Sequence, residues 1–265
     1  MINSNLDMNI TKYVCVDWKA LVDVIDALGG LDLDLTKEEV HWVNGYITET
    51  ANSIGYPCDA LKGEGRVHLN GVQAVSYSRI RYTSGDDFLR ASRQRIVLQA
   101  ILEKCKGEDI ATLTSMCSSM MDDISTNFTV KEILALAKNV TKYQISSTTG
   151  FPYNVATKEL SGVGDTVIPI DLATDVVQLH KYLFEDESYT VSDTVQSISD
   201  TVQKKTDVDS KTDIYDTTKY NNTAGSTGTE GAKKKNKDAQ DALKKSQSES
   251  ENDSTTKSSS DDSDD

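Results

Sequence analysis

Apolar and polar positions alternate with two different periodicities within the first forty residues. Leu21, Val22, Ile25 and Leu28 recur at helical spacing, with Asp17 as a plausible N-cap before them and Gly29-Gly30 after them. Residues 31–35 then alternate Leu with Asp, which is typical of a half-buried strand. A short β-like run at 13–16 precedes the helix. The order strand, helix, strand predicts an α/β protein built in layers.

The rest of the chain to residue 189 predicts more helices than strands. Thr36 and Glu39 form a capping box for a helix towards Tyr46, and Thr129 and Glu132 form another for a helix through Val140. Further helices are expected at 69–78, 86–104, 109–121 and 172–184, strands at 143–149 and 167–170, and a loop at 52–65. The predicted fold is a layered mixture of α and β, with a central mixed sheet flanked by helices.

The composition changes near residue 190. Residues 186–265 contain no Trp or Phe and consist largely of Ser, Thr, Asp and Lys. Apart from one weakly amphipathic stretch at 191–202, such a segment buries too little apolar surface to offset the entropy of the chain. We therefore predict a folded domain at 1–189 and a low-complexity, mostly disordered tail at 190–265.

Charge and cysteine usage argue against a nucleic-acid-binding protein, a protein that binds anionic lipid and a zinc protein. The net charge of −14 disfavours general binding to nucleic acid or anionic lipid, although a local basic pocket remains compatible with it. The four cysteines and three histidines show no zinc-ligand spacing, so we expect ordinary buried or surface side chains. A disulfide between two of the cysteines would form only if the domain is exported. We find no signal peptide and no apolar stretch that could span a membrane.

One cluster could carry chemistry, and it lies at 79–94. In a helix that begins near Asp86, the side chains of Asp87, Arg90 and Gln94 fall within an arc of about 60°. Guanidinium groups bind phosphate oxygens bidentately, and a carboxylate among them orders the arginines, binds a metal or removes a proton. The same pattern also fits a solvated helix face with a modest ion pair. Spacing alone does not decide between these two interpretations.

The motifs around this cluster resemble those of the LytR-CpsA-Psr family. The block Leu69-Asn70-Gly71-x-Gln73-Ala74-x-x-Tyr77-x-Arg79-x-Arg81 is followed by Gly85-Asp86-Asp87-Phe88-x-Arg90-x-x-Arg93-Gln94. Flanking segments agree in order, over about 175 residues. The resemblance implies an enzyme at the extracytoplasmic face of the bacterial cell membrane, which transfers teichoic acid, capsule or a similar glycopolymer from polyprenyl pyrophosphate to peptidoglycan.

The resemblance also assigns roles to individual residues. Asp87 and Arg90 are implied to be catalytic, and the pyrophosphate is implied to bind the side chains of Arg79, Arg81, Arg90, Arg93 and Gln94. Arg93 matches the motif, but its helical angle favours a supporting position. The family also implies a divalent cation (Mg or Mn), for which this sequence offers few of the usual ligands.

The sequence departs from the family pattern at its beginning. Family members have a membrane helix and earlier Asp and Arg motifs, so we expect an N-terminally truncated domain, inactive as written. Two other functions stay open: a non-catalytic module that binds lipid pyrophosphates, and a transcriptional regulator. The acidic charge and the lack of a basic helix-turn-helix disfavour the regulator.

Overall fold

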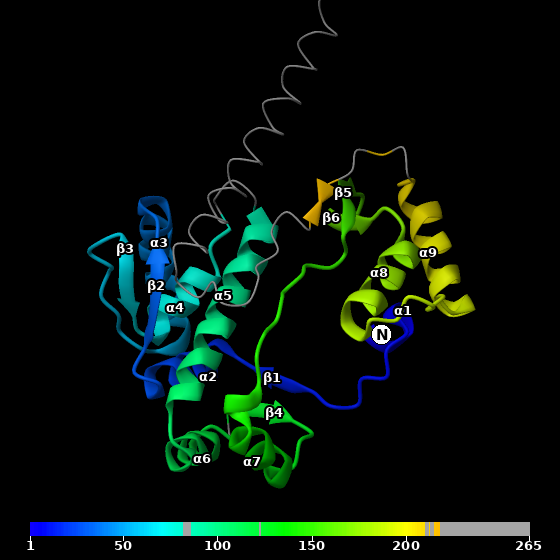
Figure 1. Ribbon diagram of the computed structural model, residues 1–265. Coiled ribbons are helices and arrows are strands. Elements are labelled where there is room, and N and C mark those ends of the chain that lie inside the picture. The colour runs from blue at the N-terminus through cyan, green and yellow to red at the C-terminus, as the bar shows by residue number, and fades with distance from the viewer. Residues whose placement is uncertain (82–85, 122, 210–211, 213–214, 218–265) are drawn as a thin grey trace, which may run out of the picture. The chain divides into compact units, whose positions relative to one another are not determined.

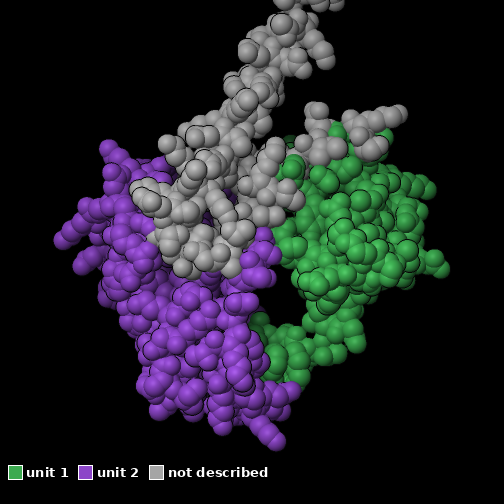
Figure 2. All heavy atoms as spheres, in the orientation of Figure 1, with its two compact units in different colours: residues 1–14, 126–128, 149–221 green, residues 15–125, 129–148, 222–265 purple. Residues whose placement is uncertain are grey.

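The chain folds into two compact units. This computed structural model describes residues 1–81, 86–121, 123–209, 212 and 215–217, without the side chains of 86–88 and 215 (Figure 1). Unit 1 comprises Met1–Val14, Thr126–Phe128 and the described part of Thr149–Asn221, and unit 2 comprises Cys15–Ser125 and Thr129–Thr148 (Figure 2). The predicted cluster at 79–94 belongs to unit 2.

Unit 2 is mostly helical. Its elements are α2 (Trp18–Ala27), β2 (Leu31–Leu35), α3 (Lys37–Ile54), β3 (Gly65–Leu69), α4 (Gly71–Ser78), α5 (Asp86–Gly107), α6 (Ile110–Ser119), α7 (Val130–Lys138) and the 3-10 turn η1 (Val140–Lys142). Helix α4 packs against α2, α3 and α5, and α5 also contacts β2 and η1. Because α4 touches three other helices, it occupies the middle of this unit.

The helices of unit 2 begin where the predicted caps lie. The Asp17 side chain accepts from the amide of Ala20, and both capping boxes are formed, Thr36 with Glu39 and Thr129 with Glu132. Asn70 and Gln73 form a third capping box at the start of α4. These caps satisfy amides that the first turn of a helix leaves without a partner. The helix starts predicted at Asp17, Thr36 and Thr129 are thus confirmed, whereas the helix predicted from residue 69 begins at Gly71.

The core of unit 2 lies under β2 and α4. Leu31, Leu33 and Leu35 are buried while the intervening aspartates are partly exposed, as the alternation predicts. Strand β2 pairs antiparallel with β3, with Leu31 opposite Leu69 and Leu35 opposite Gly65. These leucines join the buried residues of α2, α3, α4 and α5 in one apolar cluster. A single core therefore orients all four helices.

Helices α2 and α4 approach each other closely at Gly71. A Cβ atom added there would lie 2.4 Å from the carbonyl oxygen of Val22. Only glycine leaves room for this contact, which explains its place directly after the Asn70 cap.

Unit 1 combines a small sheet with three helices. Its elements are α1 (Ile2–Leu6), β5 (Asn154–Leu160), β6 (Gly164–Pro169), β7 (Tyr215–Asp216), α8 (Leu172–Phe184) and α9 (Asp193–Thr206). The strands lie in the order β6-β5-β7, with Val155 opposite Pro169 and Leu160 opposite Gly164. Helix α9 packs against α1 and α8. The predicted boundary at residue 189 therefore precedes a helix that is part of this unit.

The strands form small sheets. Strands β1 (Val14–Val16) and β4 (Ile124–Thr126) make a two-stranded sheet whose residues are divided between the units. The mixed α and β class is confirmed, but the described strands form three separate sheets in place of one central mixed sheet. Residues 143–149 form no extended strand, whereas β3 and β5 were not predicted. Within the predicted tail at 190–265, the structure contains helix α9, and residues 218–265 lie outside the described residues.

Among the described residues of unit 1, one carboxyl group is buried. Asp175 on α8 is 1% exposed, and one of its oxygens accepts from the amide of Tyr153 at 3.3 Å. Burial raises the pKa of Asp175 to about 7, against hydrogen bonds from the amides of Tyr153 and Asn154 that lower it. The folded chain therefore keeps this proton at pH values where the unfolded chain has released it.

This difference predicts a pH-dependent stability. The contribution of Asp175 falls as the pH rises from about 4 to about 7, because the unfolded state releases its proton first, at about 1.4 kcal/mol per pKa unit. We therefore compare the free energy of unfolding of Asp175→Asn with that of the wild type at two pH values. The variant's free energy of unfolding relative to the wild type should be about 2–4 kcal/mol higher at pH 8 than at pH 4. Urea unfolding at both pH values measures this, with the exposed Asp165→Asn as a control that shows no such change. Equal differences at both pH values would contradict the prediction.

Candidate functional site

Arg79 ends helix α4 and is held by residues of two other helices. Its guanidinium group lies 3.7 Å from the ring centroid of Trp18, the first residue of α2, and 5.5 Å from that of Tyr46 on α3. It donates to Thr50 Oγ1 at 2.8 Å and to Glu49 Oε1 at 2.7 Å. Only 13% of the side chain is exposed. A cation held by rings and hydrogen bonds together has little freedom to reorient.

Arg93 on α5 is completely buried. Its Nε donates to Glu39 Oε1 at 3.1 Å, and its Nη1 donates to the carbonyl of Ile80 at 3.4 Å. Neither Arg93 nor Glu39 is more than 1% exposed. The other carboxylate oxygen of Glu39, Oε2, accepts from the amide and the hydroxyl of Thr36. The carboxylate of Glu39 thus caps α3 and also neutralises the charge of Arg93 on α5.

The contact at Ile80 brings two parts of the predicted cluster together. Ile80 lies between Arg79 and Arg81, so Arg93 fastens this segment to α5. Arg90 and Gln94 belong to the same helix, Arg90 partly buried and Gln94 exposed. Arg81 is exposed at the start of the connection. The segment that carries Arg79 and Arg81 is therefore fixed to the helix that carries the other two.

The remaining predicted site residues differ in what the structure tells of them. Asp87 lies in α5, but its side chain is outside the described residues. Arg93 points into the core, where Glu39 and Ile80 engage its guanidinium group. Its burial fits the supporting position that the helical angle favours.

Only one sequence pattern pointed to the groups that hold these arginines. Trp18, Tyr46, Glu49 and Thr50 surround Arg79, and Glu39 was expected only as a helix cap. The spacing of Tyr46 and Thr50, one turn apart on α3, places both on one face, and it was the only available signal.

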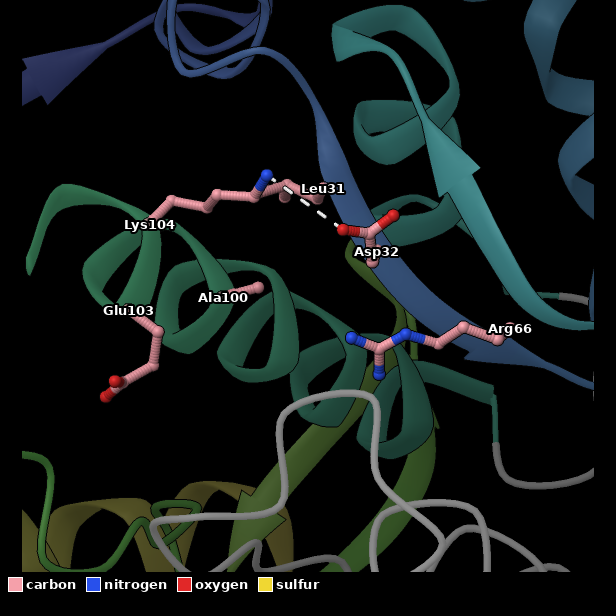
Figure 3. Close-up of a pocket in the computed structure, with 6 residues that line it drawn as sticks. All are labelled: Leu31, Asp32, Arg66, Ala100, Glu103 and Lys104. Atoms are coloured by element: carbon pink, nitrogen blue, oxygen red, sulfur yellow. Dashed lines mark ion pairs between the residues drawn. The ribbon is translucent and has the colours of Figure 1, made fainter. Parts of the chain in front are cut away.

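A second group of charges lies between β2, β3 and the end of α5. Figure 3 shows Lys104 directed towards Asp32, whereas Glu103 points away from it. Lys104 lies 3.9 Å from Asp32, Arg66 lies 3.7 Å from Asp34, and His68 Nδ1 lies 2.9 Å from Asp32 Oδ1. The hydrogen bond from His68 lowers the pKa of Asp32. The lining of the hollow of about 190 Å³ beside these pairs contains as many carboxylates as cations, so it has no excess of positive charge for a phosphate.

The described residues offer no obvious place for a metal ion. They contain no group of three or more His, Cys, Asp or Glu side chains arranged to hold one. The expected Mg or Mn ion thus has no fitting ligand set among the described residues. All four cysteines are free thiols, so the open possibility of a disulfide is not realised. None of the helices within the described ranges is long and apolar enough to cross a membrane.

The fold and the arginine cluster define a mixed α/β domain whose guanidinium groups have the chemistry to bind a phosphate-bearing ligand. A profile of the LytR_cpsA_psr family matches residues 1–176. The chain belongs to this family, which confirms the resemblance of the motifs at 69–94.

Two relatives carry names that describe a reaction. The chain is 28% identical over 137 residues to the polyisoprenyl-teichoic acid–peptidoglycan teichoic acid transferase TagV of Bacillus subtilis, covering 51% of this chain and 33% of TagV. It is 30% identical over 138 residues to the transferase TagU of Bacillus mycoides, covering 51% of this chain and 40% of TagU. The chain therefore spans well under half the length of these relatives.

A solved structure agrees with the fold. Protein gbs0355 of Streptococcus agalactiae is 25% identical, with a TM-score of 0.52, over 72% of this chain and 63% of that one. The similarity extends beyond the segment shared with the transferases and includes most of the described residues.

The buried ion pair predicts a marked loss of stability when one partner is removed. Arg93→Met leaves the Glu39 carboxylate without its cation in the core, at a cost of about 3–5 kcal/mol. Urea unfolding measures this loss. The double variant Glu39→Gln with Arg93→Met restores neutrality, so it should be more stable than Arg93→Met alone. A double variant that loses the sum of the two single losses would contradict the coupling.

Proposed function

We propose that this chain carries the arginine-rich part of the site of a cell-wall glycopolymer transferase. The substrate would be a teichoic acid, capsule or similar polymer linked to polyprenyl pyrophosphate, and the acceptor would be peptidoglycan. Family membership and the names of the transferases TagV and TagU support this proposal. Such a reaction takes place at the extracytoplasmic face of the membrane, where we therefore place the protein.

One observation carries the proposal at the level of side chains: the fixed junction of α4 and α5. Arg93 binds the carbonyl of Ile80, and Arg79 is clamped between Trp18 and Thr50. The positive charges of neighbouring arginines repel one another. Here the neighbouring elements hold the guanidinium groups in position against that repulsion. Guanidinium groups fixed in advance bind a pyrophosphate with little further loss of side-chain entropy.

The roles are those that the resemblance to the family implies, with Arg93 adjusted to its buried position. Arg79, Arg81, Arg90 and Gln94 would bind the pyrophosphate oxygens, and Arg90 would also stabilise the charge that develops on them. Asp87 would accept the proton of the attacking hydroxyl. Arg93, buried with Glu39, would be a positioning residue for this set.

The transfer itself is an exchange of phosphorus–oxygen bonds. A sugar hydroxyl of the acceptor attacks the phosphorus that carries the polymer, and its proton passes to Asp87. The bond from that phosphorus to the bridging oxygen breaks, and polyprenyl phosphate leaves with its negative charge held by the arginines. No oxidant or reductant is consumed.

Binding of a short prenyl pyrophosphate tests the role of Arg90. We expect Arg90→Ala to weaken the binding of farnesyl pyrophosphate by about 10–100-fold, because a hydrogen bond to a charged group contributes about 1.5–3 kcal/mol. Isothermal titration calorimetry of the full chain measures the affinity. Lys131→Ala, which removes an exposed cation of α7, is the matched control and should bind as the wild type does. Equal affinity of Arg90→Ala and wild type would refute the assigned pyrophosphate site.

The alternative of a module that only binds lipid pyrophosphates is separated by a second variant. If the protein is a transferase, Asp87→Ala in a chimera with the part of TagV that this chain does not match removes the transfer of labelled polymer to peptidoglycan but leaves farnesyl pyrophosphate binding nearly intact. The prediction that the chain alone does not turn over is tested in the same assay, where robust transfer would contradict it.

A further inference from the structure

A hollow of about 380 Å³ opens beside the residue that stacks on Arg79. It lies where α2 begins and α3 ends, and it is lined by Val16, Asp17, Trp18, Lys19, Ser53 and Ile54. Pockets for small ligands have volumes of about 300–1,000 Å³, so this one has room for a compact molecule. Neither the assigned pyrophosphate contacts nor the paired charges near Lys104 use it.

Trp18 gives this hollow a rigid aromatic wall. Arg79 lies 3.7 Å from its ring centroid, and Thr50 and Glu49 in turn hold Arg79. Even so, 42% of Trp18 is exposed. A large aromatic side chain that is fixed and still open to solvent binds a ligand at low entropic cost.

The polar groups of the lining are balanced in charge. Asp17 accepts from the amide of Ala20 at 2.8 Å, and Lys19 donates to Asp23 at 2.8 Å. Ser53 adds a hydroxyl, and Val16 and Ile54 add apolar surface. One carboxylate and one ammonium group give no excess of positive charge for a second phosphate. Hydrogen-bonding groups beside an aromatic ring suit an uncharged ligand with hydroxyl and amide groups.

We propose that this hollow is a saccharide subsite, which binds one amino-sugar unit with its C–H face against Trp18. The positively polarised C–H groups of a pyranose ring are attracted to the negative face of the indole, and its hydroxyl and amide groups reach Asp17, Lys19 and Ser53. Its use in transfer rests on the proposed function, because Trp18 connects it directly to Arg79. The sugar comes either from the acceptor glycan or from the first unit of the carried polymer.

Tryptophan fluorescence reports on this subsite. The chain has two tryptophans, so Trp42→Phe leaves Trp18 as the single emitter. We expect its emission to change as the trisaccharide of N-acetylglucosamine is added, and expect no change in Trp18→Phe, where Trp42 alone emits. Circular dichroism confirms that both variants fold. A flat titration in Trp42→Phe overturns the proposal.

A filled pocket gives a second test that does not depend on tryptophan. Ser53→Tyr fills the hollow from an exposed position of α3, and Asn52→Tyr places the same ring on the neighbouring exposed residue, outside the lining. By calorimetry, Ser53→Tyr should weaken trisaccharide binding by about tenfold or more, which corresponds to about 1.4 kcal/mol. Asn52→Tyr should bind as the wild type does. Equal weakening by both variants, or by neither, refutes the subsite.

The source of the sugar is decided by a parallel titration with UDP-N-acetylglucosamine, a soluble sugar diphosphate. If the free trisaccharide still binds when farnesyl pyrophosphate is present, the sugar in the subsite comes from the acceptor glycan. Binding of the sugar diphosphate alone, lost in Ser53→Tyr, assigns the carried polymer. If Arg90→Ala leaves the affinity for farnesyl pyrophosphate unchanged, the proposed function is refuted. If Ser53→Tyr still weakens trisaccharide binding in that case, the subsite remains supported.

Discussion

The buried contact between Glu39 and Arg93 determines how the centre of unit 2 is assembled. Two ions removed from water are stable there only because each has a charged partner and further hydrogen bonds, from Thr36 and to Ile80. These bonds fix the start of α3, the end of α4 and the middle of α5 to one another. A hydrophobic pair would fill the same space without specifying that geometry. The charge pair therefore contributes orientation, and the apolar cluster around it contributes most of the stability.

Arg79 extends the same arrangement to the surface. It connects the end of α4 with Trp18 of α2 and with Thr50 of α3, so all four helices of the central cluster contact one of two arginines. Arg79 and Arg93 differ in what surrounds them. The core encloses Arg93 completely, whereas Arg79 lies against Trp18, a residue that lines the hollow, and keeps a small exposed part. Two arginines of one sequence block thus have different surroundings, one inside the fold and one near its surface.

Local signals predicted much of this fold. Caps at Asp17, Thr36 and Thr129 located three helices, and the Leu-Asp alternation located β2, because these patterns depend on neighbouring residues. Strand β3 was missed since only Val67 and Leu69 are apolar in it, and its pairing partner lies over thirty residues earlier. The helical angle separated Arg93 from Arg90 and Gln94. Its partner Glu39 is 54 positions away, beyond the reach of any periodicity.

The charge of the chain explains why this geometry matters. With a net charge of −14, the long-range field does not attract a pyrophosphate. At physiological ionic strength that field decays over about 8 Å, so the ligand senses mainly the groups that it touches. In the proposed site, Arg79, held by Trp18 and Thr50, and Arg90, on the helix that Arg93 fastens to Ile80, would act at this short range and would match phosphate oxygens in direction as well as charge. Lysines of equal charge would lack that match, because an ammonium group on a flexible stem is a point charge without a planar fork. On the proposed function, selectivity for the pyrophosphate would therefore depend on the rigidity of the α4–α5 junction more than on the number of cations near it.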